Sequence, residues 1–246
     1  MKNIVVNTLV FAKQHAQGMS QFDMVQQLNE AGFNKIEIRR EYFKNIKEET
    51  AVIGEYANTH TLTLFYSVPL PLYDQHKLDK SSIRGYFQEA SQMKASSVKL
   101  VIGDDHLVEA EDVSFLNELQ QTFNISLTVE NDQTTENGTG DKIYNFVTEF
   151  NRKGGKIGVT FDAGNWIWVK EDPIENAKKL APFVTYLHLK DVSGWENPTP
   201  VFLNEGIIDW QEIRNLLNKD IPVALEYPMG EYVLEVLQQE YETFNR

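Results

Sequence analysis

The chain has 246 residues, 41% hydrophobic and 24% charged, so it is long enough for a packed core and too apolar for wholesale disorder. It carries 36 Asp and Glu against 23 Lys and Arg, and the formal net charge of -13 disfavours nucleic acid as a partner, because a negative surface repels phosphates. Cysteine is absent, which excludes disulfides and thiolate chemistry, and no apolar run approaches the roughly 18 residues of a membrane span, so no membrane partner is expected.

The N-terminal run 4–12 loosely imitates a signal peptide after Lys2. It is short and carries Asn7 and Thr8 at its centre, and it reads equally well as a buried strand. We interpret it as the first strand of the fold and expect a cytoplasmic protein.

Eight β-rich runs follow one another along the chain and alternate with segments of helical period. Most are short, rich in Val, Ile, Leu and Thr and nearly continuous in apolar character, which is typical of strands covered on both faces. They span residues 4–10, 35–39, 61–68, 97–102, 125–130, 156–162, 184–189 and 221–227. Between them, apolar residues recur at helical spacing, as in Phe22, Val25 and Leu28, and turn signals such as Gly154-Gly155 end the helices.

This alternation predicts a parallel sheet with right-handed crossovers. At this length a closed (β/α)8 TIM barrel, a single domain over residues 1–246, fits better than an open doubly wound sheet. The open sheet would carry a glycine-rich phosphate turn after its first strand, and residues 7–17 contain no such motif.

Four consecutive predicted strands end in residues that can ligate a metal. Glu130, Asp162, His188 and Glu226 lie at the carboxyl ends of strands five to eight, where the active site of a TIM barrel is built. Three converging carboxylates would repel one another unless a cation neutralised them. Three oxygens and one imidazole suit one divalent ion, with Mn²⁺, Mg²⁺ or Co²⁺ favoured and Zn²⁺ admitted. The alternative is that these are rim charges that pair with lysines or cap loops.

The segments around these residues resemble the xylose isomerase-like TIM barrels over essentially the whole chain. That superfamily contains sugar epimerases, inosose isomerases and dehydratases, dehydroshikimate dehydratases and type IV endonucleases. The segments that carry the resemblance are Val129-Glu130-Asn131, Thr160-Phe161-Asp162, Leu187-His188-Leu189-Lys190-Asp191, residues 204–210 and Leu225-Glu226-Tyr227.

The resemblance implies roles for individual residues. It makes Glu130, Asp162, His188 and Glu226 the metal ligands, with the two glutamates also the acid–base pair on opposite faces of the substrate. It makes Glu136 a substrate-binding residue, although an exposed loop acid explains Glu136 equally well.

The sequence departs from the family pattern at several positions. Asn165 stands where the family often has the histidine of an Asp-x-x-His motif, and it can bind a substrate hydroxyl but cannot act as a base. Gly194 stands where the epimerase branch has an arginine. Ser67 and Gly103 replace histidines of the endonuclease branch, which argues with the acidic charge against DNA repair.

Other residues near the strand ends are candidates for substrate binding. Glu37 closes strand two and is expected either to orient the substrate or Lys190, or to pair with a neighbouring arginine. Lys190 points inward if His188 does, because strand side chains alternate, and it either contacts a substrate oxygen or neutralises Glu226. Trp166 and Trp195 lie in the following loops and either pack against a sugar ring or belong to the core.

Together these features predict a metal-dependent isomerase or epimerase of a small keto-sugar or cyclitol. The reaction would proceed by proton abstraction next to a metal-held carbonyl, through an enediolate. A dehydratase of a cyclitol or of dehydroshikimate is the nearest alternative, and a non-catalytic metabolite-binding barrel is the alternative from another class. A homo-oligomer is compatible with the sequence, but no interface is identified from it.

Overall fold

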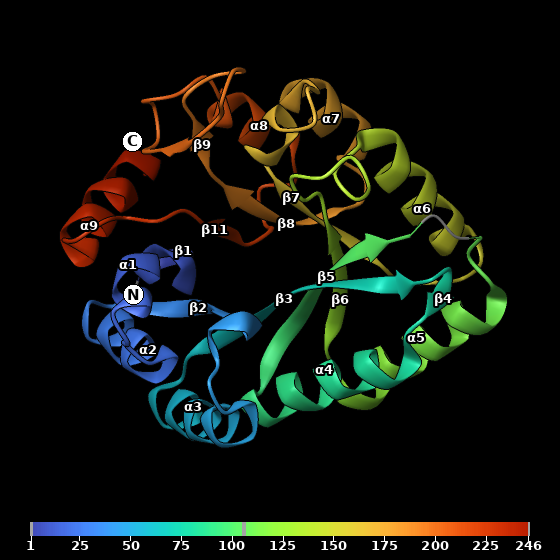
Figure 1. Ribbon diagram of the computed structural model, residues 1–246, viewed down its shortest axis with the longest axis horizontal. Coiled ribbons are helices and arrows are strands. Elements are labelled where there is room, and N and C mark those ends of the chain that lie inside the picture. Colours follow the sequence, from blue (N-terminus) through green and yellow to red (C-terminus); the bar gives the residue numbers. More distant parts are fainter. Residues whose placement is uncertain (1, 105–106, 246) are drawn as a thin grey trace.

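Eight parallel strands form a closed barrel in the computed structural model, which describes residues 2–104 and 107–245 (Figure 1). Hydrogen-bonded neighbours follow the order β2-β1-β11-β8-β7-β6-β5-β3, and pairing of β2 with β3 closes the ring. The first strand thus lies between the second strand and the last. The barrel strands are β1 (Lys2–Asn7), β2 (Phe33–Arg39), β3 (Thr63–Asp74), β5 (Ala95–Gly103), β6 (Ser126–Glu130), β7 (Gly158–Asp162), β8 (Val184–Leu189) and β11 (Val223–Leu225).

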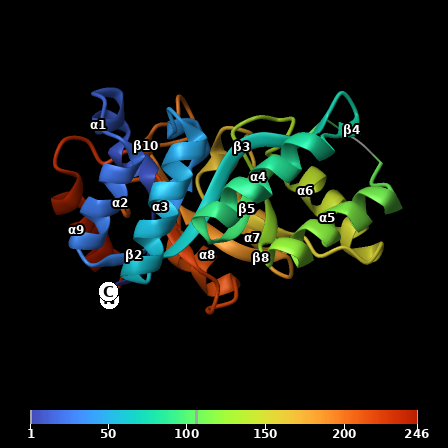
Figure 2. The same ribbon diagram turned by 90° about the horizontal axis from the view of Figure 1, so that it is seen from below.

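Helices surround the barrel, as Figures 1 and 2 show from two directions. Several begin at side-chain caps that satisfy their first N–H groups, such as Ser20 before α2 and Asp172 before α7. The helices are α1 (Ala12–Ala16), α2 (Gln21–Glu30), α3 (Ile46–His60), α4 (Lys80–Met93), α5 (Ala110–Phe123), α6 (Gly140–Arg152), α7 (Pro173–Leu180), α8 (Trp210–Leu216) and α9 (Val233–Phe244). None of the helices in the described residues is long and apolar enough to cross a bilayer.

Strand alternation divides the core into an outer shell and a barrel interior. Val6 and Ile36 belong to the large apolar shell between strands and helices. Val5, Phe65 and Ala224 point the other way and form, with Tyr186, a small apolar cluster of their own. The strands also direct a second, strongly polar group of buried side chains inward, and these make the candidate site described below.

The predicted barrel is confirmed, but the ends of several strands differ from the prediction. The first strand ends at Asn7, because the Asn7 side chain accepts the N–H of Leu9 and begins a short 3-10 helix, Thr8–Phe11. The third strand continues to Asp74 and turns back as β4 (Lys77–Leu78). The turn residues Gln75 and His76 have φ of 49° and 60°, and neither is a residue type that marks such a turn in sequence.

A second small hairpin lies after β8 and was likewise not predicted. It pairs β9 (Asp191–Val192) with β10 (Pro200–Val201) in antiparallel register. Asp191 anchors the following loop by accepting N–H groups from Gly206 and Ile208. The loop after β8 is therefore tied to the barrel rim.

Candidate metal centre

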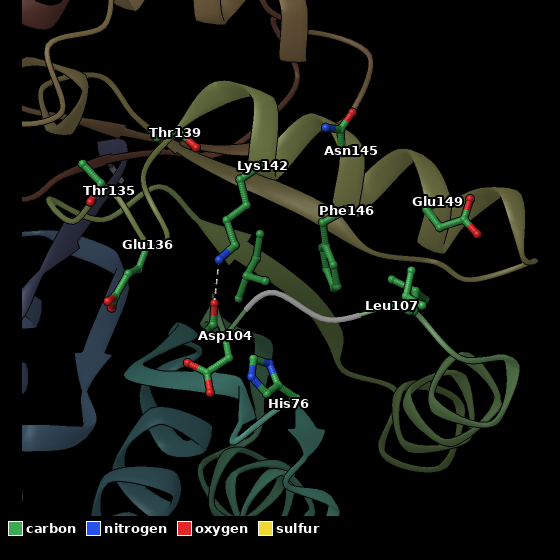
Figure 3. Close-up of a pocket in the computed structure, with 13 residues that line it drawn as sticks. His76, Asp104, Leu107, Thr135, Glu136, Thr139, Lys142, Asn145, Phe146 and Glu149 are labelled. Atoms are coloured by element: carbon green, nitrogen blue, oxygen red, sulfur yellow. Dashed lines mark hydrogen bonds between the residues drawn. The ribbon is translucent and has the colours of Figure 1, made fainter.

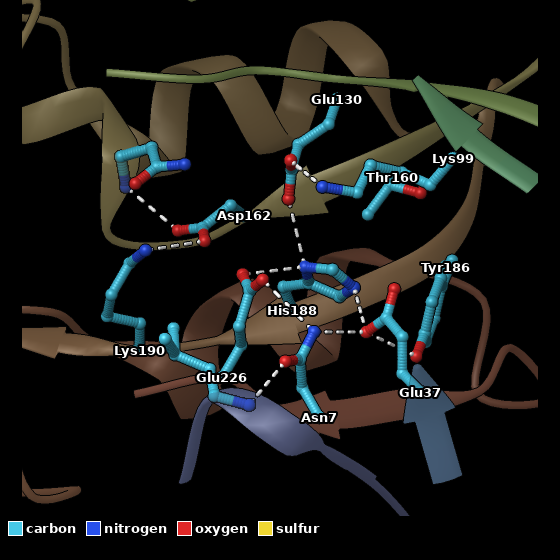
Figure 4. A network of polar contacts seen from close by, with 12 residues as sticks. Asn7, Glu37, Lys99, Glu130, Thr160, Asp162, Tyr186, His188, Lys190 and Glu226 are labelled. Atoms are coloured by element: carbon cyan, nitrogen blue, oxygen red, sulfur yellow. Dashed lines mark hydrogen bonds and ion pairs between the residues drawn. The ribbon is translucent and has the colours of Figure 1, made fainter. Parts of the chain in front are cut away.

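The structure brings Glu130, Asp162, His188 and Glu226 together inside the barrel (Figure 4). They come from four strands adjacent around the barrel, β6, β7, β8 and β11, each at or beside the carboxyl end. One ligand atom from each lies within 4.8 Å of the others. None of the four residues is more than 5% exposed, so the cluster is almost wholly screened from water.

His188 occupies the centre of the cluster. Its Nδ1 lies 2.9 Å from Oε1 of Glu130 and 2.9 Å from Oε2 of Glu226. Its Nε2 lies 3.0 Å from Oε2 of Glu37, which also accepts hydrogen bonds from Asn7 and Tyr186. Glu37 therefore faces the ring nitrogen opposite the cluster, an arrangement that orients a metal-binding histidine.

Three cations face the carboxylates of the cluster: Lys99 and Lys190 are buried, and Arg39 is partly buried. Lys190 Nζ lies 2.9 Å from Asp162 Oδ2, and Arg39 lies 2.7 Å from Glu226 Oε1. Lys99 forms an ion pair with Glu130 Oε2. The protein thus supplies its own neutralising charges, so repulsion among carboxylates does not by itself require a metal ion, contrary to the argument made from sequence.

The pKa values of these groups reflect burial opposed by ion pairing. Burial raises the pKa of Glu226, but His188 and Arg39 outweigh it and hold that pKa well below its usual range. Burial also raises the pKa of Glu130, but the charge of Lys99 outweighs it and lowers that pKa below its usual value. Burial raises the pKa of Asp162 to about 6, with Lys190 opposing the shift. Burial lowers the pKa of His188, but Glu37 and Glu226 reverse this and raise it well above its usual range.

The donor set nevertheless fits a divalent ion. A single proton on His188 Nδ1 cannot be donated to both glutamates, and Glu130 Oε1 has no hydrogen bond within the described residues although it is buried. Asp162 Oδ2 is buried as well, and its partner is the Lys190 ammonium at 2.9 Å. A cation in place of the His188 proton would satisfy Glu130 Oε1, Glu226 Oε2 and the ring nitrogen together. Three carboxylate oxygens and one imidazole nitrogen suit Mn²⁺, Mg²⁺ or Co²⁺, and Zn²⁺ is also compatible.

A tight turn after β7 fixes Asp162. Its Oδ1 accepts the N–H groups of Gly164 and Asn165, both at 2.9 Å. A Cβ on Gly164 would lie 2.9 Å from the Lys190 carbonyl oxygen, so only glycine fits this close approach without displacement. Asn165 donates to the Asn131 carbonyl oxygen and accepts from Gln133. The side chain that replaces the family histidine is therefore engaged in holding two loops together.

The remaining predicted substrate residues lie apart from this cluster. Trp166 is fully buried against Phe161, with ring centroids 5.2 Å apart, and belongs to the core. Trp195 is 43% exposed in the loop before β10, and its carbonyl oxygen accepts from Lys170. Glu136 is exposed and lines a cavity of about 670 Å³ beside α6 (Figure 3). None of the described residues that line this cavity belongs to the four-residue cluster.

Sequence reasoning missed four members of the polar network: Asn7, Arg39, Lys99 and Tyr186. Lys99 carried a usable signal, since it interrupts the apolar run Val98–Ile102 of a buried strand. From sequence, a pair of Glu37 with Arg39 or Arg40 is one of two alternatives for Glu37. The structure pairs Arg39 with Glu226 and Glu41 instead, because Glu37 faces His188.

The sequence matches one protein family over most of its length. Residues 25–243 match the family model described as xylose isomerase-like TIM barrel. The chain belongs to this family. No curated protein sequence matches the chain significantly.

Solved structures of the family share the fold at low sequence identity. The probable 3-DHS dehydratase AsbF from Bacillus anthracis has a TM-score of 0.73 and 19% identity, with 100% of this chain and 99% of that chain covered. The IolI protein with a bound zinc atom has a TM-score of 0.73 and 16% identity, over 99% and 96% of the two chains. D-allulose 3-epimerase from Methylomonas sp. has a TM-score of 0.71 and 14% identity, over 99% and 96%. At such identities the likeness establishes the fold, and reactions differ among these neighbours.

Proposed function

We propose that the chain is a divalent-metal-dependent isomerase or epimerase of a small keto-sugar or cyclitol, acting by proton abstraction beside a carbonyl. The observation that carries the proposal is the convergence of Glu130, Asp162, His188 and Glu226 within 4.8 Å at the carboxyl end of a xylose isomerase-like barrel. Active sites of TIM barrels are built at this end. The zinc in IolI and the activity of the epimerase neighbour support the same assignment.

The two glutamates are the proposed acid–base pair. Glu130 follows β6 and Glu226 follows β11, with β7 and β8 between them, so their carboxylates approach the barrel axis from different sides. Transfer of a proton to either face of a substrate carbon needs such an arrangement. Their lowered pKa values keep both ionised at neutral pH and able to accept a proton.

When bound, a divalent ion supplies the Lewis acid that polarises a carbonyl and acidifies the neighbouring C–H. Carboxylates weakened as bases by Lys99 and Arg39 are adequate only for a C–H acidified in this way. Lys190 is proposed to shift from Asp162 toward a substrate oxygen, and Glu37 to hold the His188 ring. Glu136, Asn165, Trp166 and Trp195 remain predictions for substrate binding, with Trp166 and Asn165 now assigned structural contacts as well.

The proposal is tested by metal analysis and by proton exchange. We expect about one divalent ion per chain, lost in Glu130→Gln and Glu226→Gln and retained in Glu111→Gln, whose carboxylate pairs with Lys80 outside the barrel. Incubation in D₂O with a panel of ketoses, inososes and dehydroshikimate, followed by NMR, should show deuterium entering one substrate. Failure to bind any divalent ion would refute the mechanism.

A dehydratase of a cyclitol or of dehydroshikimate is the second candidate. It is favoured by the likeness to AsbF, which covers the whole chain, and by Gly194 in place of the epimerase arginine. The same NMR experiment separates the two, because a dehydratase product has lost water. A non-catalytic metabolite-binding barrel would take up ligand without exchange. A cytoplasmic location and a homo-oligomer remain predictions from sequence.

A further inference from the structure

Lys99 is a buried cation in the middle of an apolar barrel strand. It is 3% exposed, and Val98 and Leu100 on either side are fully buried. The register of β5 and β6 places Lys99 beside Thr128, so its ammonium reaches two residues further along the neighbouring strand to meet Glu130. A buried charge is costly unless a partner compensates it, and here that partner is the metal-ligand candidate itself (Figure 4).

The contact makes the two oxygens of Glu130 different. Lys99 occupies Oε2, whereas Oε1 faces His188 Nδ1 at 2.9 Å. A carboxylate ligand can bind an ion through one oxygen or through both. With Oε2 held by the ammonium, Glu130 presents only Oε1 to the centre of the cluster.

The two carboxylate oxygens of Glu226 also contact different groups. Oε1 is held by Arg39 at 2.7 Å and by Asn7 at 3.1 Å. Oε2 faces His188 Nδ1 at 2.9 Å. Two glutamates from different strands therefore turn one oxygen inward and give the other to a cation.

We propose that Lys99 is a positioning residue that keeps Glu130 in a one-oxygen binding mode and thereby limits the affinity of the site for its ion. The inference rests on the metal site of the proposed function. Its consequence is that coordination positions of the ion stay open for substrate oxygens, as catalytic metal sites require.

The direction in which metal affinity changes when Lys99 is removed distinguishes this role from that of a residue that strengthens a metal ligand. Partners that increase a ligand's basicity strengthen metal binding, and their loss weakens it. Lys99 does the opposite, because its positive charge lowers the basicity of Glu130 and repels a divalent ion. Removing the charge should therefore tighten binding.

The test measures the affinity for Mn²⁺ by EPR and the visible absorption of bound Co²⁺ in the full chain. For Lys99→Met we expect Mn²⁺ to bind at least about tenfold more tightly. The substitution removes a buried positive charge near the divalent ion, and the repulsion between two such charges is several times the thermal energy. The Co²⁺ absorption should weaken as Glu130 contributes its second oxygen. Lys99→Arg keeps the charge and should retain wild-type affinity within about threefold. Lys80→Met, which removes a lysine outside the barrel, is the matched control.

Each outcome is decisive. Unchanged or weaker binding with an unchanged Co²⁺ spectrum in Lys99→Met overturns the inference and leaves the proposed function intact. A wild-type chain that binds neither ion overturns both. If Lys99→Met does not fold, judged by circular dichroism, Lys99→Gln is measured in its place and must show the same tightening.

Discussion

Asn7 joins the first strand of the barrel to the second and the last, and its removal should destabilise the fold. Its Nδ2 donates to Glu37 at 2.8 Å and to Glu226 at 3.1 Å, and its Oδ1 accepts the N–H of Leu9 at 2.8 Å. Hydrogen bonds to charged groups contribute about 1.5–3 kcal/mol each, but both carboxylates keep other donors, so we take the lower value. Loss of the cap adds about 1 kcal/mol. Asn7→Ala is therefore expected to lower the free energy of unfolding by about 4 kcal/mol.

Urea unfolding followed by circular dichroism measures this change. Asn7→Ser keeps a capping oxygen but does not reach the carboxylates, so it should be about 1 kcal/mol more stable than Asn7→Ala. Ser20→Ala is the matched control at an exposed cap, where about 1 kcal/mol is expected. If Asn7→Ala costs no more than Ser20→Ala, the argument that this side chain ties the strands together is wrong.

Three further predictions concern the core, a buried acid and the metal. Phe161→Ala should cost about 3–5 kcal/mol of unfolding free energy, because it empties a fully buried site against Trp166; a cost below about 1 kcal/mol would contradict the packing. Burial raises the pKa of Glu240, so its ionisation opposes folding, and stability should fall as pH rises from the normal carboxyl pKa through the raised one. Glu240→Gln keeps an oxygen that accepts from Tyr227 and Leu203. In urea titrations from pH 4 to 8, the free energy of unfolding of Glu240→Gln should therefore increase relative to that of wild type as pH rises. Chelation should leave the far-ultraviolet circular dichroism unchanged, because buried cations pair the carboxylates without metal, but lower the melting temperature by mass action. Loss of the helical signal on chelation would show that the ion is required for folding.

The barrel and the cluster could be predicted because both follow from short-range patterns. Strand length and apolar continuity mark each β-segment, and the parallel topology brings every strand end to one rim. Once strands ending in Glu130, Asp162, His188 and Glu226 were recognised, their proximity followed from the fold.

The partners of these residues could not be predicted, because they depend on the stagger between strands. Lys99 reaches Glu130 only because the register sets it beside Thr128 on the neighbouring strand. Arg39 on β2 does not pair with Glu37, two residues away, but with Glu226, which follows β11 on the other side of β1. The β3–β4 hairpin escaped prediction for a different reason, since its turn lacks glycine or asparagine.

The position of β11 between β1 and β8 has a consequence for biosynthesis. As the chain leaves the ribosome, β1 lacks one of its two neighbours until residues 223–225 have been made. Until then β1 and β8 present open edges, which are sites of misassociation. The three-residue strand Val223–Leu225 covers both edges at once, and Glu226 arrives with it. Completion of the ring and assembly of the polar cluster therefore depend on the same strand, so the four side chains come together only as the open edges of β1 and β8 are covered.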